Sequence, residues 1–405
     1  MGRILYNTTQ LALRMPYCDG VNMSSTDIIY YQKIFAQKTW AWWLNLIGTF
    51  VVFVISFCGN LLCLFVLCRQ RLKRNSYTQY LIALAIVDTG AILCEALTAL
   101  DDVYHYNSDG KLALFQHTAL SCKLYYYIRY VFYSMSSWVT VALAVERLVA
   151  IKFPLWSKYI CSVINARRIL LLILIFTMII QSYHFVVKGL DCKTTASSVS
   201  KQSCRCKTLV KYVEVDIILT IYLWRLCLMT LLPLTIIITV NILIMSKLFS
   251  GKSLVDSANT LDNARRKTLL LYKISRMLVI VSSIYLLLHV PGSSFEIIKF
   301  MFLHTFQVCN GKWHYYIFVI HDIFDLLTNF NYGINFYLYI ISGKHIRSEL
   351  FRTIKHSTFR STLTGNTGKF QRSSYFMSSY VHNSKTYQPN CSHIQLSKQP
   401  TGSSI

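Results

Sequence analysis

Charged residues are scarce in this chain of 405 residues, and acidic residues are the scarcest among them. Only 14% of the residues are charged, whereas 54% are hydrophobic, and 17 acidic residues stand against 41 basic ones. Soluble domains carry about 25% charged residues, so the composition excludes a chain of two or three soluble domains. It is typical of a membrane protein.

The sequence also lacks the short motifs by which enzyme chemistry is recognised. It contains no HExxH or GxSxG pattern and no clustered metal-ligand spacing, so we predict neither an enzyme nor a bound cofactor. The basic residues are spread over loops and tail without a nucleic-acid-binding fold, so nucleic acid is not an expected partner. No repeat relates the two halves, which makes a channel or transporter a less favoured alternative.

Seven apolar stretches are long enough to cross a bilayer, which takes about 20 residues. Four contain no charge between their ends, at residues 38–69, 168–188, 225–247 and 276–296. Three more contain charges inside an apolar pattern, at residues 77–100, 124–151 and 315–342. We predict an all-α membrane protein, with an extracellular N-terminal segment at residues 1–41 and a seven-transmembrane helix bundle at residues 42–342.

Two further segments are expected after the bundle. Ile346, Leu350 and Ile354 recur every four residues opposite basic residues. This pattern predicts a short amphipathic eighth helix at residues 343–355 on the inner membrane face. Residues 356–405 are rich in Ser, Thr, Asn and Gln, which predicts a disordered cytoplasmic tail.

Basic residues determine the expected orientation. They collect in the loops at residues 69–74, 152–168 and 264–276, and short loops rich in Lys and Arg stay in the cytoplasm beside anionic membrane lipid. The N-terminus is then extracellular, and the sequons at Asn7 and Asn22 fall on the side where glycosylation occurs. We therefore expect a multi-pass protein of the plasma membrane.

Six cysteines lie on the extracellular side in this orientation, where disulfides persist. They are Cys18, Cys122, Cys192, Cys204, Cys206 and Cys309. Their even number permits several bridges, and the spacing leaves the connectivity open.

Polar residues inside the predicted spans recur at helical spacing. A polar group that faces lipid is costly, so such residues normally face the interior of the bundle. The second, third and seventh spans carry these stripes: Asp88 and Glu95; Arg129, Tyr133, Ser136, Thr140 and Arg147; Asp325, Asn329, Tyr332, Asn335 and Tyr339. They predict a polar core that connects an outer cavity to the cytoplasmic side. For Ser136 or Thr140 taken singly, hydrogen bonding that only joins helices is the favoured alternative.

Over about residues 42–352 the chain resembles a rhodopsin-like (class A) G-protein-coupled receptor. The resemblance is carried, in order, by Gly59-Asn60, residues 81–88, Cys122, Glu146-Arg147-Leu148, Pro233, Pro291 and the NFYLY segment at residues 335–339. It implies a disulfide from Cys122 to the second outer loop. It also implies a G-protein switch at Glu146, Arg147, Asn335 and Tyr339, and a sodium ion held by Asp88, Ser136, Asn331 and Asn335. Implied partners are a heterotrimeric G protein and, through the Ser- and Thr-rich tail, arrestin.

The chain departs from this family pattern at several positions. Leu148 and Asn241 each replace a Tyr, His289 replaces a Trp, and Phe336 replaces a Pro. No Asp or Glu occurs from residue 263 to residue 295, so Arg147 has no carboxylate to pair with in the sixth span. We therefore expect appreciable signalling without ligand.

The outer half of the bundle is the predicted ligand site. Amine receptors have an Asp where this chain has Arg129, and light receptors need a Lys where it has Asn329, so both ligand classes are disfavoured. The predicted pocket residues carry charges of both signs beside tyrosines, which suits a peptide. They are Tyr126, Arg129, Tyr130, Tyr133, Arg225, His289, Glu296, His321 and Asp325.

A narrower resemblance supports the same ligand class. Residues 334–344 resemble invertebrate neuropeptide receptors of the FMRFamide-receptor-like kind, which implies that Glu296 or Asp325 pairs with a peptide arginine. A small acidic ligand is an alternative, because the second outer loop is rich in Lys and Arg. A further alternative is that Glu95 and Asp325 only neutralise Arg129 within the protein.

Overall fold

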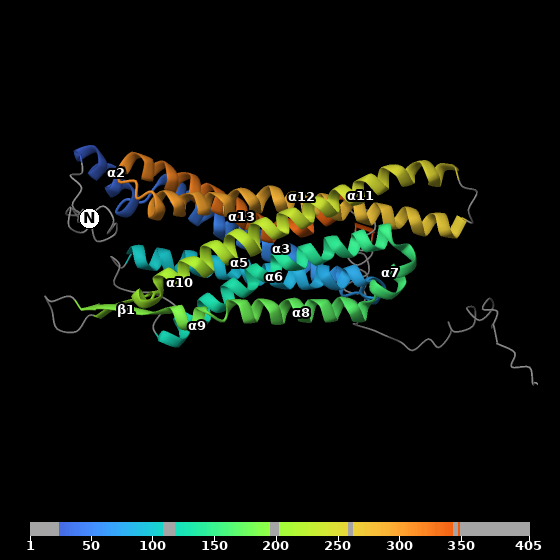
Figure 1. The fold of residues 1–405 in the computed structure, drawn as a ribbon, viewed down its shortest axis with the longest axis horizontal. Coiled ribbons are helices and arrows are strands. Elements are labelled where there is room, and N and C mark those ends of the chain that lie inside the picture. The colour runs from blue at the N-terminus through green and yellow to red at the C-terminus, as the bar shows by residue number, and fades with distance from the viewer. Residues whose placement is uncertain (1–23, 108–117, 195–201, 258–261, 343–346, 349–405) are drawn as a thin grey trace, which may run out of the picture. The chain divides into compact units, whose positions relative to one another are not determined.

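The computed structural model describes residues 24–107, 118–194, 202–257, 262–342 and 347–348 (Figure 1). These residues belong to one compact unit, which spans residues 1–353. Several predicted features lie outside the described residues: Asn7, Asn22, Cys18, the tail at residues 356–405, and the eighth helix at residues 343–355 apart from Arg347 and Ser348.

The structure is almost entirely helical, with a single two-stranded sheet among the described residues. The first half contains α2 (Ser25–Phe35), α3 (Trp40–Leu67), α4 (Gln70–Lys73), α5 (Ser76–Asn107), α6 (Ala119–Lys152), α7 (Pro154–Ile160), α8 (Val163–Gln181) and α9 (His184–Val187). The strands β1 (Lys188–Thr194) and β2 (Gln202–Thr208) follow. The second half contains the 3-10 helix η2 (Val210–Tyr212), α10 (Val213–Ile217), the π-helix η3 (Ile218–Leu231), α11 (Leu232–Ser257), α12 (Asp262–Phe300), the π-helix η4 (Met301–Thr305) and α13 (Gly311–Ser342).

Side-chain caps mark where several of the long helices begin. Thr39 accepts a hydrogen bond from the backbone N–H of Trp42 at 3.0 Å and starts α3. Thr118 and Ser121 form a reciprocal capping box at the start of α6. Ser162 starts α8 in the same way. Such caps satisfy backbone N–H groups that have no partner within the helix.

The seven predicted spans correspond to long helical stretches. Six stretches among the described residues are long and apolar enough to cross a membrane: Ser25–Leu67, Ser76–Tyr104, Ala119–Lys152, Val163–Val187, Val210–Lys247 and Tyr272–Leu303. The seventh is α13, which has a lower hydropathy because it carries Asp322, Asp325, Asn329 and other polar residues. Its polar side chains are turned toward the bundle, so α13 completes the predicted seven-helix architecture.

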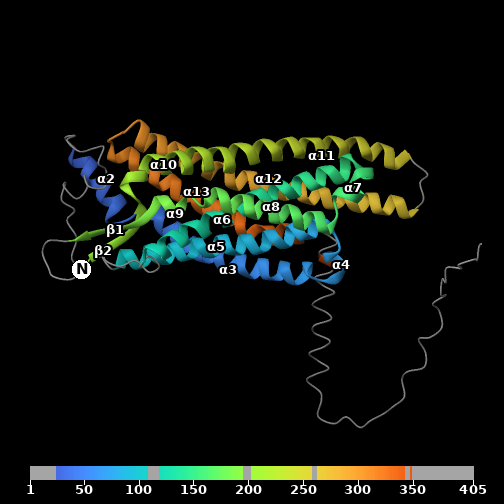
Figure 2. The same ribbon diagram turned by 60° about the horizontal axis from the view of Figure 1, so that its bottom comes forward.

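The long helices pack side by side as a bundle (Figures 1 and 2). α13 packs against α3, α5 and α12, while α6 packs against α5, α8, α11 and α12. In α6, 72% of the most apolar window is buried inside the protein, against 17% in α8. α6 is therefore the central helix, and α8 is left to face the membrane.

The hairpin of β1 and β2 lies at the same end of the bundle as α2 (Figures 1 and 2). Its antiparallel register pairs Leu190 with Cys206, and a disulfide joins Cys206 to Cys122 in the first turn of α6. This confirms the bridge implied between Cys122 and the second outer loop. Cys309 is also disulfide-bonded, and Cys192 lies opposite Cys204 in the register.

The helix α2 was not predicted from the sequence. The carboxylate of Asp27 accepts a hydrogen bond from the backbone N–H of Gly311 at 2.8 Å, at the start of α13. A Cβ atom on Gly311 would lie 2.6 Å from the backbone oxygen of Asp27, so only glycine permits this approach. The rings of Tyr31 and His314 pack edge to face in the same contact. The segment before the bundle is thus joined to the last span.

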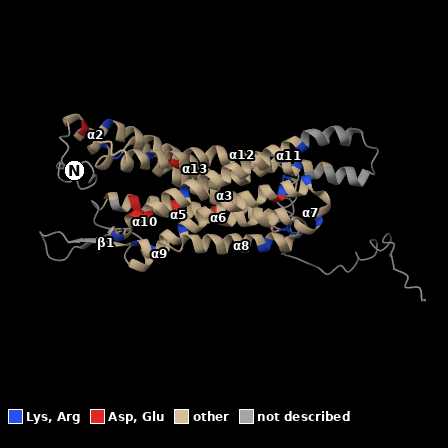
Figure 3. Ribbon diagram, in the orientation of Figure 1, with Lys and Arg blue, Asp and Glu red and all other residues tan. Residues whose placement is uncertain are grey.

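Basic residues gather around α7 at one end of the bundle (Figure 3). The described part of this group includes Lys152, Lys158, Arg167 and Arg168. Most of the visible acidic residues lie toward the opposite end, near α10 (Figure 3). This separation of charge along the bundle is the pattern from which the sequence predicts the cytoplasmic end.

Candidate functional site

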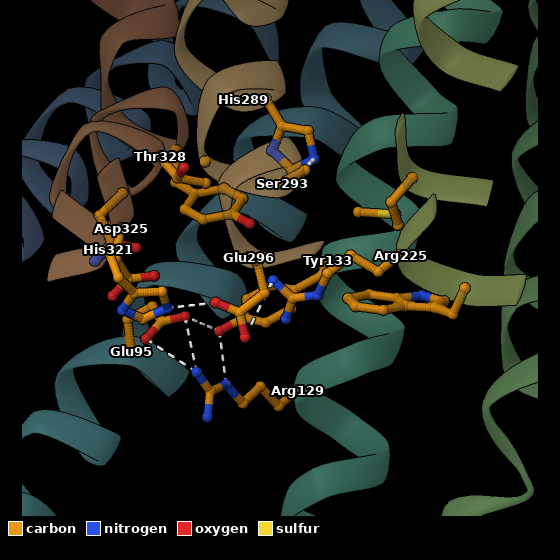
Figure 4. Close-up of a pocket in the computed structure, with 15 residues that line it drawn as sticks. Glu95, Arg129, Tyr133, Arg225, His289, Ser293, Glu296, His321, Asp325 and Thr328 are labelled. Carbon is orange, nitrogen blue, oxygen red and sulfur yellow. Dashed lines mark hydrogen bonds and ion pairs between the residues drawn. The ribbon is translucent and has the colours of Figure 1, made fainter. Parts of the chain in front are cut away.

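A cavity opens between α5, α6, η3, α12 and α13 (Figure 4). Seven of the nine residues predicted to form the ligand pocket line it: Arg129, Tyr133, Arg225, His289, Glu296, His321 and Asp325. Its walls therefore carry basic and acidic side chains together, drawn from five helices. Such convergence of polar groups in a concave site is typical of a ligand pocket.

One ion pair in the cavity joins α5 to α6. The Nη2 group of Arg129 donates to both carboxylate oxygens of Glu95, at 3.1 and 3.2 Å, and its Nε group donates to the hydroxyl of Tyr133 at 2.7 Å. The hydroxyl of Tyr133 in turn hydrogen-bonds Glu95. Figure 4 shows this triangle of Glu95, Arg129 and Tyr133. Arg129 is thus paired with Glu95, one of the two carboxylates that the sequence alternative assigned to it, whereas Asp325, the other, hydrogen-bonds Asn45.

A second polar group joins η3, α12 and α13. Glu296 pairs with His321, and its other oxygen lies 3.8 Å from the guanidinium of Arg225. The second ring nitrogen of His321 faces Asp322 at 3.4 Å, and Asp322 accepts a hydrogen bond from Thr39 at 3.3 Å. The row of polar contacts therefore continues from the cavity to the first residue before α3.

Asp325 stands apart from both groups. Its carboxylate accepts a hydrogen bond from the amide of Asn45 at 3.1 Å, and no Lys, Arg or His within the described ranges lies within ion-pair distance of it. Asp325 lines the cavity (Figure 4). The cavity thus presents one carboxylate that makes no direct ion pair with a residue in the described part of the chain.

Two predicted pocket residues do not line the cavity. The ring of Tyr130 stacks on His184 with 4.5 Å between centroids, and the ring of Tyr126 lies 6.4 Å from the same histidine. Lys188 also lies over Tyr126, with 5.1 Å from its Nζ to the ring centroid. The stripe of tyrosines in α6 therefore divides: Tyr133 faces the cavity, while Tyr126 and Tyr130 pack toward α9 and the hairpin.

Eight lining residues were not placed in the pocket from the sequence: Glu95, Trp224, Met229, Gly292, Ser293, Thr328, Asn329 and Tyr332. The available signal was helical spacing. Ser293 follows His289 by one turn, and Thr328 and Tyr332 continue the row of His321 and Asp325. Helical spacing did not predict the lining residues of η3, which is a π-helix. Trp224 and Arg225 are adjacent in the sequence, yet both line the cavity.

The predicted sodium site lies deeper in the bundle. Asp88 is fully buried and accepts hydrogen bonds from Ser136 at 2.6 Å and from Asn335 at 2.7 Å. These oxygen-bearing side chains are of the type that hard cations prefer, although Asn335 turns its amide nitrogen toward Asp88. Asn331 is buried nearby on α13, and no hydrogen bond from it to Asp88 is found in the described part of the chain.

The predicted G-protein switch lies at the other end of α6. Arg147 is only 4% exposed and is ion-paired with its neighbour Glu146, which also accepts a hydrogen bond from Ser76 at 2.5 Å. Tyr339 is 1% exposed, and its hydroxyl has no hydrogen-bond partner among the described residues. The structure therefore buries the arginine in a contact between α5 and α6.

Comparison with known proteins gives a consistent result. The family model described as "7 transmembrane receptor (rhodopsin family)" matches residues 59–339. The neuropeptide S receptor of Mus musculus is 26% identical over 147 residues, covering 35% of this chain and 38% of that receptor. The thyrotropin-releasing hormone receptor of Mus musculus is 24% identical, covering 37% of each chain.

A longer match covers most of both chains. The growth hormone secretagogue receptor type 1 of Oryctolagus cuniculus is 25% identical over 315 residues, which are 76% of this chain and 80% of that receptor. The matches to the first two relatives span less than two fifths of their length. The family is one of receptors, which confirms the expectation that the chain is not an enzyme. By its family match and the six apolar helices of membrane-spanning length in its described part, the chain is a multi-pass membrane protein that belongs to the rhodopsin family of seven-transmembrane receptors.

Proposed function

We propose that this chain is a plasma-membrane receptor, with an extracellular N-terminus, that binds a peptide in the cavity and activates a heterotrimeric G protein. The observation that carries the proposal is the cavity, whose walls hold charges of both signs, together with two buried polar groups deeper in the bundle, one at Asp88 and one at Arg147. The basic group around α7 supports the orientation, because it marks the end expected in the cytoplasm.

A peptide fits the cavity because it brings its own charged and aromatic groups to a wall of mixed charge. Relatives named as receptors for neuropeptide S and for thyrotropin-releasing hormone support this ligand class. The resemblance of residues 334–344 to FMRFamide-receptor-like sequences supports an invertebrate neuropeptide receptor. A small acidic ligand is less well supported, because Arg129 is already paired with Glu95 and Lys188 with Asp216.

Of the two carboxylates expected to pair with a peptide arginine, Asp325 is the better candidate. Glu296 already contacts His321 and Arg225, so a ligand cation would have to compete with both. Among the described residues, Asp325 accepts a hydrogen bond from the amide of Asn45 and makes no direct ion pair. A ligand cation would therefore gain a full ion pair at Asp325 without breaking one.

Ligand binding is proposed to shift an equilibrium between a resting and an active arrangement of the helices. Asp88, Ser136 and Asn335 tie α5, α6 and α13 together below the cavity, so these hydrogen bonds must rearrange when the helices move. A sodium ion bound by this group would supply positive charge beside Asp88. Arg147 would then leave Glu146 and contact the G protein, as the family resemblance implies.

Three further partners and modifications are proposed from the sequence. The Ser- and Thr-rich tail would bind arrestin after phosphorylation, since phosphate adds charge that basic surfaces recognise. The basic loops would contact anionic lipid. Asn7 and Asn22 would carry glycans on the extracellular side.

The proposal is tested with a library of neuropeptides applied to cells that express the chain, with nucleotide exchange on a panel of G proteins as the readout. At least one peptide is expected to drive exchange. The Arg147→Gln variant, expressed at the same surface level, is the control and should bind that peptide without driving exchange. Ligand-driven ion flux without G protein would instead favour a channel, and a response only to small acidic molecules would favour the alternative ligand class.

A further inference from the structure

No acidic residue of α12 between residues 263 and 295 is available to hold Arg147 in its resting position. From residue 263 to residue 295 the chain contains no Asp or Glu, so this part of α12 offers no carboxylate to a cation at the inner end of α6. Within the described ranges the ion-pair partner of Arg147 is Glu146, on its own helix. An ion pair between neighbours on one helix does not hold two helices together. A contact to another helix is needed to keep the arginine buried.

That contact is made by Tyr77 on α5. The central carbon of the Arg147 guanidinium lies 4.7 Å from the centroid of the Tyr77 ring. The arginine is 4% exposed and the tyrosine 9%, so both partners are removed from water. A guanidinium over the face of an aromatic ring is attracted by the ring's negative face, and this attraction is strongest when the pair is desolvated.

The start of α5 holds the ring in place. Ser76 donates a hydrogen bond to Glu146 at 2.5 Å, so two consecutive residues of α5 contact the two members of the ion pair. One turn further on, Gln79 donates to the backbone oxygen of Lys73 at 2.9 Å and accepts a hydrogen bond from Arg167 at 3.1 Å. These hydrogen bonds join the first turn of α5, which carries Tyr77, to α4, α6 and α8.

We propose that Tyr77 is a positioning residue that restrains Arg147 in the resting receptor, in the place of a carboxylate on α12. The inference rests on the proposed role of Arg147 in activating a G protein. In the resting state the guanidinium is held between the Glu146 carboxylate and the Tyr77 ring. Activation requires the arginine to leave the ring, so the strength of this stacking sets part of the balance between resting and active states.

The test measures ligand-free nucleotide exchange with purified receptor in lipid nanodiscs and a panel of G proteins. Tyr77→Leu removes the ring and is expected to raise the exchange rate by about 2- to 30-fold, the range that corresponds to one cation–π contact. Tyr77→Phe keeps the ring and should keep the restraint. Ring fluorination at position 77, introduced as mono-, di- and trifluorophenylalanine, withdraws electrons with little change of shape. The exchange rate should rise with each added fluorine.

The fluorinated series distinguishes stacking from packing. A side chain that only fills space would give the same rate in Phe and in all three fluorinated variants, and that result would overturn the proposal even if Tyr77→Leu folded poorly. Surface expression and thermal unfolding of each variant are measured alongside. If neither the unmodified receptor nor any variant accelerates exchange on any G protein, the proposed coupling fails, and the restraint fails with it. If all accelerate exchange equally, only the restraint fails.

Discussion

Arg225 on η3 and Glu296 on α12 face each other across the cavity with 3.8 Å between Nη1 and Oε1. This distance is at the outer limit of a direct ion pair, and the Nε group of Arg225 has no hydrogen-bond partner among the described residues. Glu296 completes its interactions through His321 instead. The charged residues of the cavity therefore differ in how completely they are paired within the protein. A ligand should bind most strongly to the charged residues that are least paired.

The first prediction concerns Asp325. Asp325→Asn should weaken the binding of an arginine-containing peptide by about 10- to 100-fold, because a charge-assisted hydrogen bond contributes about 1.5–3 kcal/mol. Glu296→Gln should weaken it less, since Glu296 is already paired. Competition binding measures both effects. The matched ligand has citrulline in place of arginine, and it should bind Asp325→Asn and the unmodified receptor with nearly equal affinity. A citrulline peptide that loses nothing on the unmodified receptor would contradict the assignment.

The second prediction concerns the pair of Arg129 and Glu95. Their side chains are 21% and 11% exposed, so removing one partner leaves a largely buried charge. Glu95→Gln alone should lower the free energy of unfolding by about 3 kcal/mol. The double variant with Arg129→Gln should recover part of that loss, because no unpaired charge remains. Thermal unfolding in detergent measures both. Additive losses in the double variant would show that the pair is not coupled.

The third prediction concerns the disulfide between Cys122 and Cys206. Replacing either cysteine by serine should lower stability by about 2–5 kcal/mol, and replacing both should cost no more than replacing one. Because the bridge holds the hairpin to α6, peptide affinity should fall together with stability. Thermal unfolding and binding are measured with and without reductant. Reductant should weaken the unmodified receptor more than the double variant, which still contains the disulfide of Cys309.

The fourth prediction concerns sodium. If Asp88, Ser136 and Asn335 hold the ion, sodium chloride should suppress ligand-free exchange relative to choline chloride at equal ionic strength. The suppression should disappear in Asp88→Asn, which removes the charge that attracts the cation. A salt effect of equal size for both chlorides would assign it to general screening.

The fifth prediction concerns signalling without ligand. Because no acidic residue occurs from 263 to 295, Arg147 is restrained by Glu146 and the Tyr77 ring without an ion pair to that part of α12, so the receptor should drive measurable exchange on its own. Arg147→Gln should abolish this activity. Arg168→Gln, at an exposed arginine of α8, is the matched control and should leave it unchanged. A receptor that reaches the surface normally and stays silent would refute the expectation.

The sequence predicts the seven spans because apolar length is a strong signal for a membrane helix. It also brings Asp88 and Asn335 to the same interior, because polar side chains avoid lipid. It could not predict that Tyr130 turns to His184, since a stripe of tyrosines on one helix does not show which neighbour each ring meets. The stacking of Tyr77 on Arg147 was equally hidden, because it depends on how α5 and α6 pack.

The helix α2 was missed for a related reason. Its residues show no strong apolar stripe, and it is held by contacts to α13 such as the hydrogen bond from Gly311 to Asp27. Contacts between segments so distant in the chain leave no local pattern. The row of polar contacts from Thr39 to Glu296 could not be predicted for the same reason. His321 and Asp322 are adjacent in the sequence, but their partners Glu296 and Thr39 are distant from them and from each other.

The fifth span is a continuous helix of two types, because the π-helix η3 is followed directly by the α-helix α11. A π-helix places more residues in each turn than an α-helix, so Trp224 and Arg225 reach the cavity in a register that α11 below them does not share. Rewinding any part of η3 into α-helix would rotate its outer end about the axis relative to α11. A ligand that binds Arg225 would therefore favour rotation of the outer part of the fifth span about its own axis.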